Sequence, residues 1–116
     1  MLIERLRQVK GMPYSYVMNY LPIATAADIP IADLQKRTMI SILEERMSNP
    51  LQVILQTIEA KSADSEIAGH LSVDVTLPVM YVETFVRSQE GDPIQFSRTF
   101  YRGDRYKYMV ELTRKK

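Results

Sequence analysis

Residues of alternating polarity dominate the C-terminal third of the chain. Between residues 77 and 113, aromatic and β-branched side chains alternate with polar ones, which is typical of strands that bury one face. Two runs of turn-forming residues interrupt this pattern, at residues 89–92 and at Gly103-Asp104. The sequence therefore predicts three consecutive antiparallel strands, at residues 77–88, 93–101 and 106–113.

The N-terminal half adds shorter elements. Leu2–Val9 and residues 14–21 also alternate, and the turn-forming run between them predicts a hairpin. Residues 21–30 carry a proline near each end, so we expect a loop there. One short helical turn is predicted over Ile31–Lys36, and a further strand over residues 51–61.

Capping residues mark the start of two helices. Thr38 is a suitable N-cap for a helix over residues 39–47, which the Asn49-Pro50 pair would end. Asp64 is a suitable N-cap for a helix over Ser65–Leu71. The resulting order, β-β-α-β-α-β-β-β, predicts an α+β fold in which helices pack on an antiparallel six-stranded sheet.

Composition is that of an ordinary globular domain and excludes several classes of protein. The chain of 116 residues suits one domain, with 46% hydrophobic and 25% charged residues. Its net charge of +1 is too small to attract nucleic acid to the domain as a whole. Basic residues do crowd the C-terminal fifth, and we interpret them as a solvated strand edge and tail, with a phosphate-contacting patch as the alternative.

The cysteine content and the hydropathy of the chain indicate which sites and which cellular location to expect. The chain has no cysteine and one histidine, so we expect no disulfide, no metal site and no cofactor. No apolar run reaches membrane-spanning length, and the N-terminus lacks a signal-peptide core. The expected location is therefore the cytoplasm, without a membrane partner.

Short sequence motifs follow one another along the whole chain. They are Arg5-Leu-Arg7, Gly11-Met-Pro13, Tyr20-Leu-Pro22, Asp33-Leu34 with Thr38 and Leu43-Glu44, Ile58-Glu-Ala60 with Ala68, Leu71 and Leu77-Pro78, and finally Tyr101-Arg-Gly-Asp-Arg-Tyr106. Each motif alone is a weak signal, but together and in this order they resemble the UTRA domain. That domain is the effector-sensing module of one branch of GntR-family bacterial transcription regulators.

The resemblance implies a chorismate-lyase-like fold with a buried effector pocket, and a homodimer. In the family, operator DNA is bound by an N-terminal winged helix-turn-helix domain, which this chain does not contain. We therefore expect residues 1–116 to form a single ligand-sensing domain, whose full-length protein contacts DNA only through that other domain. Binding of a small metabolite would then modulate binding to the operator.

Two arginines and one threonine are candidates for holding an anion. Arg5 and Arg7 lie two apart on a strand and share a face, where guanidiniums can bind carboxylate or phosphate in bidentate geometry. The alternative is a solvent-facing stripe, but an Arg-x-Arg at this point serves ligand binding in sugar-phosphate-sensing UTRA domains. Thr38 would add a hydroxyl and free helix-start amides, with plain capping as the alternative.

The strand over residues 93–101 supplies a row of hydrogen-bonding side chains. Gln95, Ser97, Thr99 and Tyr101 share one face, which is either a wet surface or the wall of a pocket. The resemblance matches Tyr101 to a tyrosine of the family, whereas Gln95 stands where the family commonly has Glu. Val17 likewise stands where many members carry a Glu that amino-sugar sensors use. The predicted ligand-binding residues are Arg5, Arg7, Val17, Thr38, Gln95, Ser97 and Tyr101.

The loss of both acids favours an organic acid or a less hydroxylated phosphorylated metabolite over an amino-sugar phosphate. We expect no enzymatic activity, because Asp74, Glu83 and Asp104 have no catalytic partner tied to them by the sequence. Two alternatives stay open. One is a small chorismate-lyase-like enzyme with Arg5 or Arg7 gripping a carboxylate, and the other is a dimerisation module without a ligand.

Overall fold

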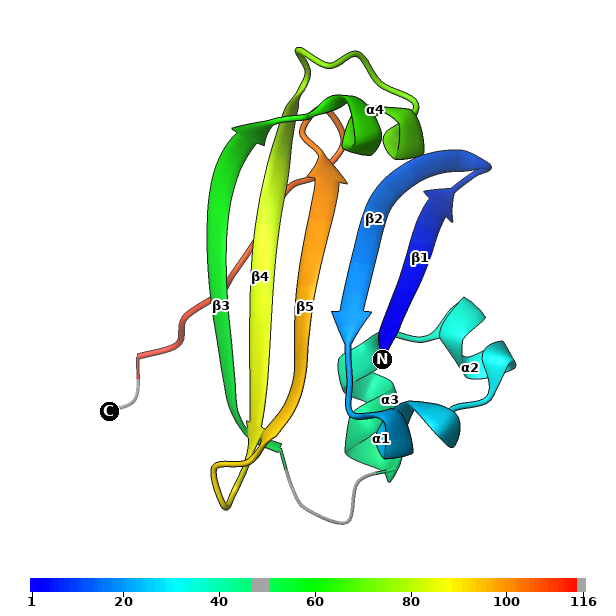
Figure 1. Ribbon diagram of the computed structural model, residues 1–116. Coiled ribbons are helices and arrows are strands. Elements are labelled where there is room, and N and C mark those ends of the chain that lie inside the picture. Colours follow the sequence, from blue (N-terminus) through cyan, green and yellow to red (C-terminus); the bar gives the residue numbers. More distant parts are fainter. Residues whose placement is uncertain (47–50, 115–116) are drawn as a thin grey trace.

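One antiparallel sheet and a set of short helices make up the computed structural model, which describes residues 1–46 and 51–114 (Figure 1). The strands in these residues are β1 (Leu2–Val9), β2 (Met12–Tyr20), β3 (Leu51–Ser62), β4 (Pro78–Ser88) and β5 (Pro93–Arg102). The helices are α1 (Ile23–Ala27), α2 (Ile31–Lys36), α3 (Met39–Arg46) and α4 (Ser65–Leu71). The five strands follow the order β1-β2-β5-β4-β3, which confirms the predicted α+β class.

A two-residue turn joins β1 to β2. Lys10 and Gly11 both have positive φ angles, 52° and 77°, as a type I′ hairpin turn requires, and glycine adopts such angles without strain. β2 begins earlier than predicted and includes Pro13, which cannot donate a hydrogen bond to the ladder. A register shift between Arg7 and Gln8 accommodates the proline.

The N-terminal hairpin is joined to the C-terminal strands through β2 and β5. Their antiparallel ladder sets Asn19 opposite Ser97 and Val17 opposite Thr99. β5 also pairs with β4, so it lies at the centre of the sheet with a strand on each side. Residues from the two ends of the chain therefore share one sheet face.

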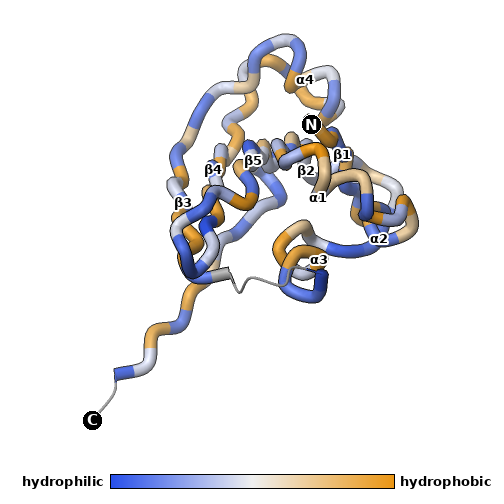
Figure 2. The backbone as a smooth tube through the Cα atoms, turned by 60° about the horizontal axis from the view of Figure 1, so that its bottom comes forward, coloured by the Kyte–Doolittle hydropathy of each residue, from blue (hydrophilic) through white to orange (hydrophobic). Residues whose placement is uncertain are grey.

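Two hydrophobic clusters pack on opposite faces of the sheet. On one face, Leu71 of α4 packs with Tyr81 and Phe100. On the other, Leu43 of α3 packs with Val86. Tyr81 and Val86 are an odd number of residues apart on β4, so they project to opposite sides. Figure 2 shows the corresponding alternation of hydrophobic and hydrophilic residues along β3 and β4, and Figure 1 shows the helices at opposite ends of the sheet.

The predicted sixth strand, at residues 106–113, is wrong. After β5, Gly103 and its neighbours form a turn, and the chain then runs extended without joining the sheet of its own chain. The reason is topological, since β2 and β4 already occupy both sides of β5. The turn requires glycine, because a Cβ at Gly103 would lie 2.2 Å from the carbonyl oxygen of Pro78.

The predicted loop over residues 21–30 is also wrong in part, because it contains α1. The Ile23–Ala27 segment is rich in alanine, which has the highest helix propensity, and Pro22 precedes the first helical residue. Ala26 and Ile29 then become buried in the cluster that includes α3. The prolines that indicated a loop lie outside the helix, where they are tolerated.

Both predicted helix caps are confirmed. The Asp64 carboxylate accepts a hydrogen bond from the Ile67 amide at 2.8 Å, and Thr38 Oγ1 accepts one from the Ser41 amide at 3.2 Å. The helix over Ile31–Lys36 is confirmed as α2. The predicted end of the next helix, at Met47 with Asn49-Pro50, lies outside the described residues. No helix among residues 1–46 and 51–114 is long and apolar enough to span a membrane.

Candidate functional site

A cavity of about 370 Å³ lies between one face of the sheet and the start of α3. Every predicted ligand-binding residue lines it, namely Arg5, Arg7, Val17, Thr38, Gln95, Ser97 and Tyr101. The fold thus brings together residues from β1, β2, β5 and the N-terminus of α3. The cavity is also lined by residues that the prediction did not include, which are Asn19, Met39, Ile40, Gln56, Thr84 and Thr99.

The floor of the cavity is a row of polar side chains that crosses four strands. Asn19 lies opposite Ser97, Ser97 opposite Thr84, and Thr84 opposite Gln56. Gln56 Nε2 donates a hydrogen bond to Thr84 Oγ1 at 3.2 Å, so the row is partly tied together. Alternation along β2 and β5 puts Asn19 and Thr99 on the same face as the predicted lining residues, so the sequence held a signal for these two. Gln56 and Thr84 could be found only from the pairing of the strands.

Arg5 is held in place by the backbone around it. Its Nη1 donates to the carbonyl oxygens of Leu34 at 3.3 Å and Arg37 at 2.8 Å, which link β1 to the segment before α3. Its Nη2 donates to Asn19 Oδ1 at 3.2 Å, and Asn19 Nδ2 donates in turn to Gln95 Oε1 at 3.2 Å. The Arg5 Nε is buried and has no partner among the described residues.

The cavity concentrates positive charge. Burial lowers the pKa of Arg5, and the adjacent charge of Arg7 lowers it further. Among the described residues that line the cavity there are two guanidiniums and no Asp or Glu. Two like charges beside buried polar groups are unfavourable unless an anion neutralises them.

Arg7 and Tyr101 lie together at one end of the cavity. Burial raises the pKa of the Tyr101 phenol, Tyr106 and Tyr14 add to the increase, and the charge of Arg7 opposes it. The Tyr101 ring stacks on the Tyr106 ring, with centroids 4.0 Å apart, and meets the Tyr14 ring edge-on at 5.7 Å. Arg7 and the Tyr101 phenol thus line the same cavity, and the charge of Arg7 acts on the phenol.

The N-terminus of α3 forms the opposite wall. The first hydrogen bond within the helix runs from the Ile42 amide to the Thr38 carbonyl at 3.1 Å. The amides of Met39 and Ile40 precede it and have no carbonyl partner inside the helix. Both residues line the cavity beside Thr38, whose hydroxyl can still donate a hydrogen bond while it caps the helix.

A wider depression of about 540 Å³ adjoins the cavity on the α2 side of β1 and shares Arg5 and Arg7 with it. Its other lining residues come mostly from the edge strand and α2, with Glu4 among them. The cavity over the sheet is the better site, because polar groups from five strands and a helix start converge there. In the described residues, no three His, Asp or Glu side chains lie together to hold a metal ion.

Comparison with known proteins identifies the family. A model of the UTRA domain matches residues 1–107. The HTH-type transcriptional repressor NagR of Bacillus subtilis (strain 168) is 24% identical over 112 residues, which cover 97% of this chain and 46% of NagR. The chain therefore spans about half the length of that curated relative.

Solved structures show the same fold. A candidate transcriptional regulator from Streptomyces coelicolor superposes with a TM-score of 0.86 at 30% identity, covering 98% of this chain and 75% of that one. The ligand-binding domain of a candidate GntR-family regulator from Bordetella bronchiseptica superposes with a TM-score of 0.79 at 22% identity, covering 97% and 70%. Because the family model spans nearly all of the sequence, this chain belongs to the UTRA domain family of the GntR-type transcription regulators.

Proposed function

We propose that this chain is the effector-binding domain of a GntR-family transcription regulator and that its cavity binds a small anionic metabolite. The observation that carries the proposal is the charge of the cavity, in which Arg5 and Arg7 are not balanced by any acidic lining residue in the described part of the chain. An anion bound there would offset the burial and the repulsion from Arg7 that together lower the pKa of Arg5. The related domain from Bordetella bronchiseptica, described as ligand-binding, is consistent with this role.

The two arginines have different parts in the proposed site. Arg7 is exposed and its guanidinium is available to form charge-assisted hydrogen bonds with the anion. Arg5 is already bonded to Leu34, Arg37 and Asn19, so it contributes charge and its unpartnered Nε. The Thr38 hydroxyl and the first amides of α3 form the second anchor for the anion.

The lining residues also favour one class of metabolite. Val17 presents methyl groups, and Gln95 presents a neutral amide whose oxygen already accepts a bond from Asn19. Neither offers a carboxylate to hold an amino group or a row of sugar hydroxyls. A carboxylic acid or a sparsely hydroxylated phosphate therefore suits the cavity better than an amino-sugar phosphate.

Regulation would follow from coupling between the cavity and a DNA-binding domain elsewhere in the full-length protein. In a homodimer, effector binding would change the relative placement of two DNA-binding domains and hence their affinity for the operator. Such coupling is typically ~1–3 kcal/mol and acts equally in both directions. The relatives that this chain matches are transcription regulators, which favours this role over an enzyme on a chorismate-lyase-like fold.

The test is a thermal-shift screen over organic acids and sugar phosphates. We expect an anion of one of the two favoured classes to give the largest stabilisation, and Arg7→Ala to weaken its binding about tenfold or more, as the loss of a charge-assisted hydrogen bond predicts. Lys10→Ala is the matched control, because Lys10 lies in the β1–β2 turn and does not line the cavity. The proposal fails if glucosamine 6-phosphate stabilises most and Arg7→Ala leaves its binding unchanged. Release of 4-hydroxybenzoate from chorismate would favour the enzyme instead.

A further inference from the structure

The β3 end of the cavity carries polar side chains that the anion site described above does not use. Gln56 on β3 and Thr84 on β4 lie opposite each other, and both line the cavity. Gln56 Nε2 donates to Thr84 Oγ1 at 3.2 Å, while the Thr84 hydroxyl can still donate a bond and the Gln56 amide oxygen can still accept one. Thr84 is only 5% exposed, so bulk water has little access to its hydroxyl. The pair is therefore suited to a polar group of a ligand.

Two more hydroxyls line the floor between this pair and the arginines. Ser97 and Thr99 lie on β5 and are 5% and 7% exposed. Neither side chain has a hydrogen-bond partner among the described residues, although buried hydroxyls are normally paired. Both are thus available to a molecule that occupies the middle of the cavity.

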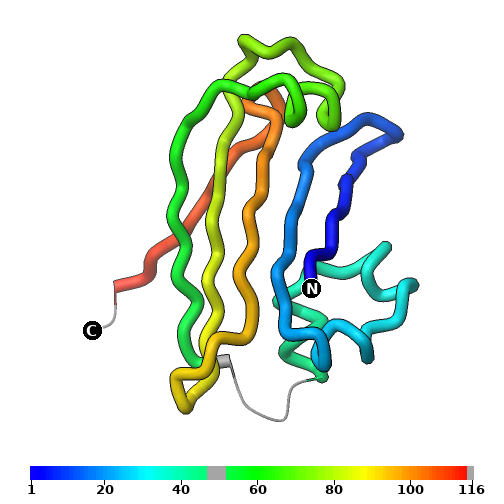
Figure 3. The backbone as a smooth tube through the Cα atoms, viewed as in Figure 1, coloured from blue at the N-terminus to red at the C-terminus, as the bar shows by residue number. Residues whose placement is uncertain are grey.

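The two anchors for the anion lie together at the other end of the cavity. Arg5 Nη2 donates to Asn19 Oδ1 on β2, and Arg5 Nη1 donates to the carbonyl of Arg37. Arg37 is the residue before Thr38, so the start of α3 lies beside this arginine. Figure 3 shows β1 and β3 at opposite sides of the sheet, and β5 and β4 separate β2 from β3. A ligand that contacts both ends of the cavity must therefore cross the sheet.

The spacing of the strands gives the length of this path. The Arg5 guanidinium lies over β2, where it bonds to Asn19, and the Thr84 hydroxyl lies on β4. Neighbouring strands are about 4.8 Å apart, so two spacings put these groups about 10 Å from each other. A compact metabolite held by the arginines would not reach Thr84.

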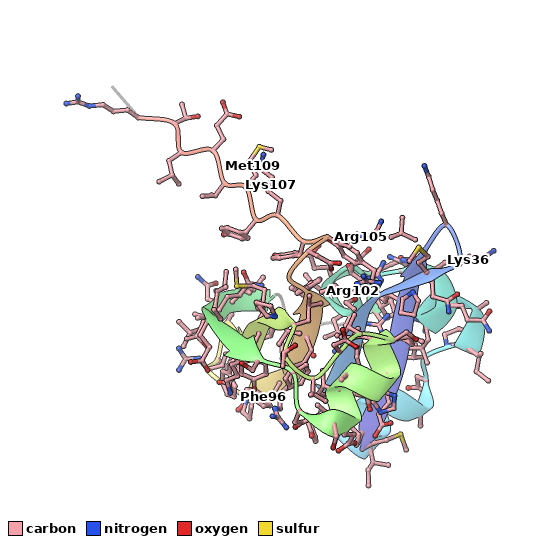
Figure 4. All side chains as sticks on the ribbon, turned by 90° about the horizontal axis from the view of Figure 1, so that it is seen from above. Lys36, Phe96, Arg102, Arg105, Lys107 and Met109 are labelled. Atoms are coloured by element: carbon pink, nitrogen blue, oxygen red, sulfur yellow. The ribbon has the colours of Figure 1, made fainter. Side chains whose placement is uncertain are left out.

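The β3 end of the cavity is both neutral and open. Among the described lining residues, Arg5 and Arg7 are the only charged ones, so a second charge on the ligand would have no partner at the far end. Gln56 is exposed. The segment after β5, which carries Lys107 and Met109, points away from the body (Figure 4), and none of its described residues lines the cavity. This end can therefore receive the uncharged tail of a ligand.

We propose that Gln56 and Thr84 form a second subsite, which binds a neutral hydrogen-bonding group of the effector about 10 Å from its anionic group. This inference rests on the proposed function and narrows the class of effector. The effector is an elongated monoanion with a hydroxyl or amide group at its far end. The chain between the two groups passes over the Val17 methyl groups and the hydroxyls of Ser97 and Thr99.

Isothermal titration calorimetry with three acids of equal chain length tests the subsite. They are octanoate, octanedioate and ω-hydroxyoctanoate, whose extended chain puts its hydroxyl about 10 Å from the carboxylate, as the strand spacing requires. We expect ω-hydroxyoctanoate to bind about three- to tenfold more tightly than octanoate, which is the effect of one hydrogen bond. Octanedioate should bind no more tightly than octanoate, because its second carboxylate would meet no cation. A hydroxy acid that bound no better than octanoate, or a diacid that bound best, would overturn the inference.

Substitutions locate the subsite within the cavity. Gln56→Leu and Thr84→Val each remove hydrogen-bonding atoms and should abolish the preference for the hydroxy acid over octanoate. Gln52→Leu is the matched control and should keep that preference, because Gln52 is exposed on the same strand and does not line the cavity. An unchanged preference in both Gln56→Leu and Thr84→Val would contradict the subsite.

Arg7→Ala separates this inference from the proposed function. It should weaken the binding of all three acids, because each has a carboxylate at the arginine end. If an anion from the thermal-shift screen depended on Arg7 but none of the three acids bound, the second subsite would be wrong and the anion site would stand. If no anion depended on Arg7, the proposed function itself would be wrong.

Discussion

Arg5 and Arg7 show how two identical residues on one strand can differ in role. Both face the cavity, but Arg5 bonds to two backbone carbonyls and to Asn19, whereas Arg7 is exposed. Arg5 therefore joins β1 to the segment that precedes α3, and so fixes one wall of the cavity. Arg7 does not link two elements in this way, so its substitution is the better test of ligand binding.

This difference predicts opposite outcomes for stability. Arg5→Ala leaves the carbonyls of Leu34 and Arg37 and the Asn19 amide oxygen without their donor, at a cost of roughly 2–3 kcal/mol in the free energy of unfolding. Arg7→Ala should change that free energy by less than about 0.5 kcal/mol, as is usual for exposed side chains. Urea unfolding of both variants provides the measurement. Equal losses would mean that Arg5 does not hold the wall in place.

Tyr16 carries a pH dependence of stability. Burial raises its pKa from 10.0 to about 12, and the Glu4 carboxylate adds to the increase. The folded state thus favours the protonated phenol, so this contribution is complete below pH 10 and is lost as the pH rises through about 12. Tyr16→Phe cannot ionise and should lose less stability between pH 10 and pH 12 than the unmodified protein does.

Urea unfolding across that pH range is the measurement. Tyr108→Phe is the matched control, because that side chain lies exposed on the segment that follows β5, and it should keep the pH dependence of the unmodified protein. If Tyr16→Phe lost stability with pH as steeply as the control, other groups would be responsible for the alkaline loss.

At the scale of elements, the start of each longer helix could be predicted and the partners of the strands could not. A helix start depends on neighbouring residues, as at Thr38 and Asp64, whose side chains accept the hydrogen bonds that the sequence indicated. Strand pairing depends on residues far apart in the sequence. The sequence therefore could not predict that the side chains from Asn19 to Gln56 form one row across the cavity floor.

The Asp64 cap gives a test at this scale. Asp64→Ala removes the acceptor of the Ile67 amide and should destabilise the protein by about 1 kcal/mol, because the start of α4 then has an unsatisfied donor. Asp64→Ser keeps an acceptor and should stay close to the unmodified protein. The free energy of unfolding in urea distinguishes them. Similar losses in both variants would assign the effect to charge rather than to capping.

At the scale of the whole molecule, the sequence predicted the class of fold but overcounted the strands of the sheet. The α+β class follows from residue patterns, which are local. Alternation at residues 106–113 indicated extended backbone, and the backbone there is indeed extended, but a pattern of side chains does not say whether an edge lies within reach. α1 was missed for the opposite reason, since flanking prolines concealed a run of alanines.

The ladder between β2 and β5 has a consequence for how the protein is made. It joins Asn19 to Ser97, so an early strand of this domain has to wait for β5, which is made much later, before their ladder can form. Contacts between such distant residues form slowly, because a long loop must close before they can be made. A nascent chain without β5 would lack the wall formed by Gln95, Ser97 and Tyr101. The cavity would therefore form only after β5 has been made, and a chain that stopped before β5 would lack it.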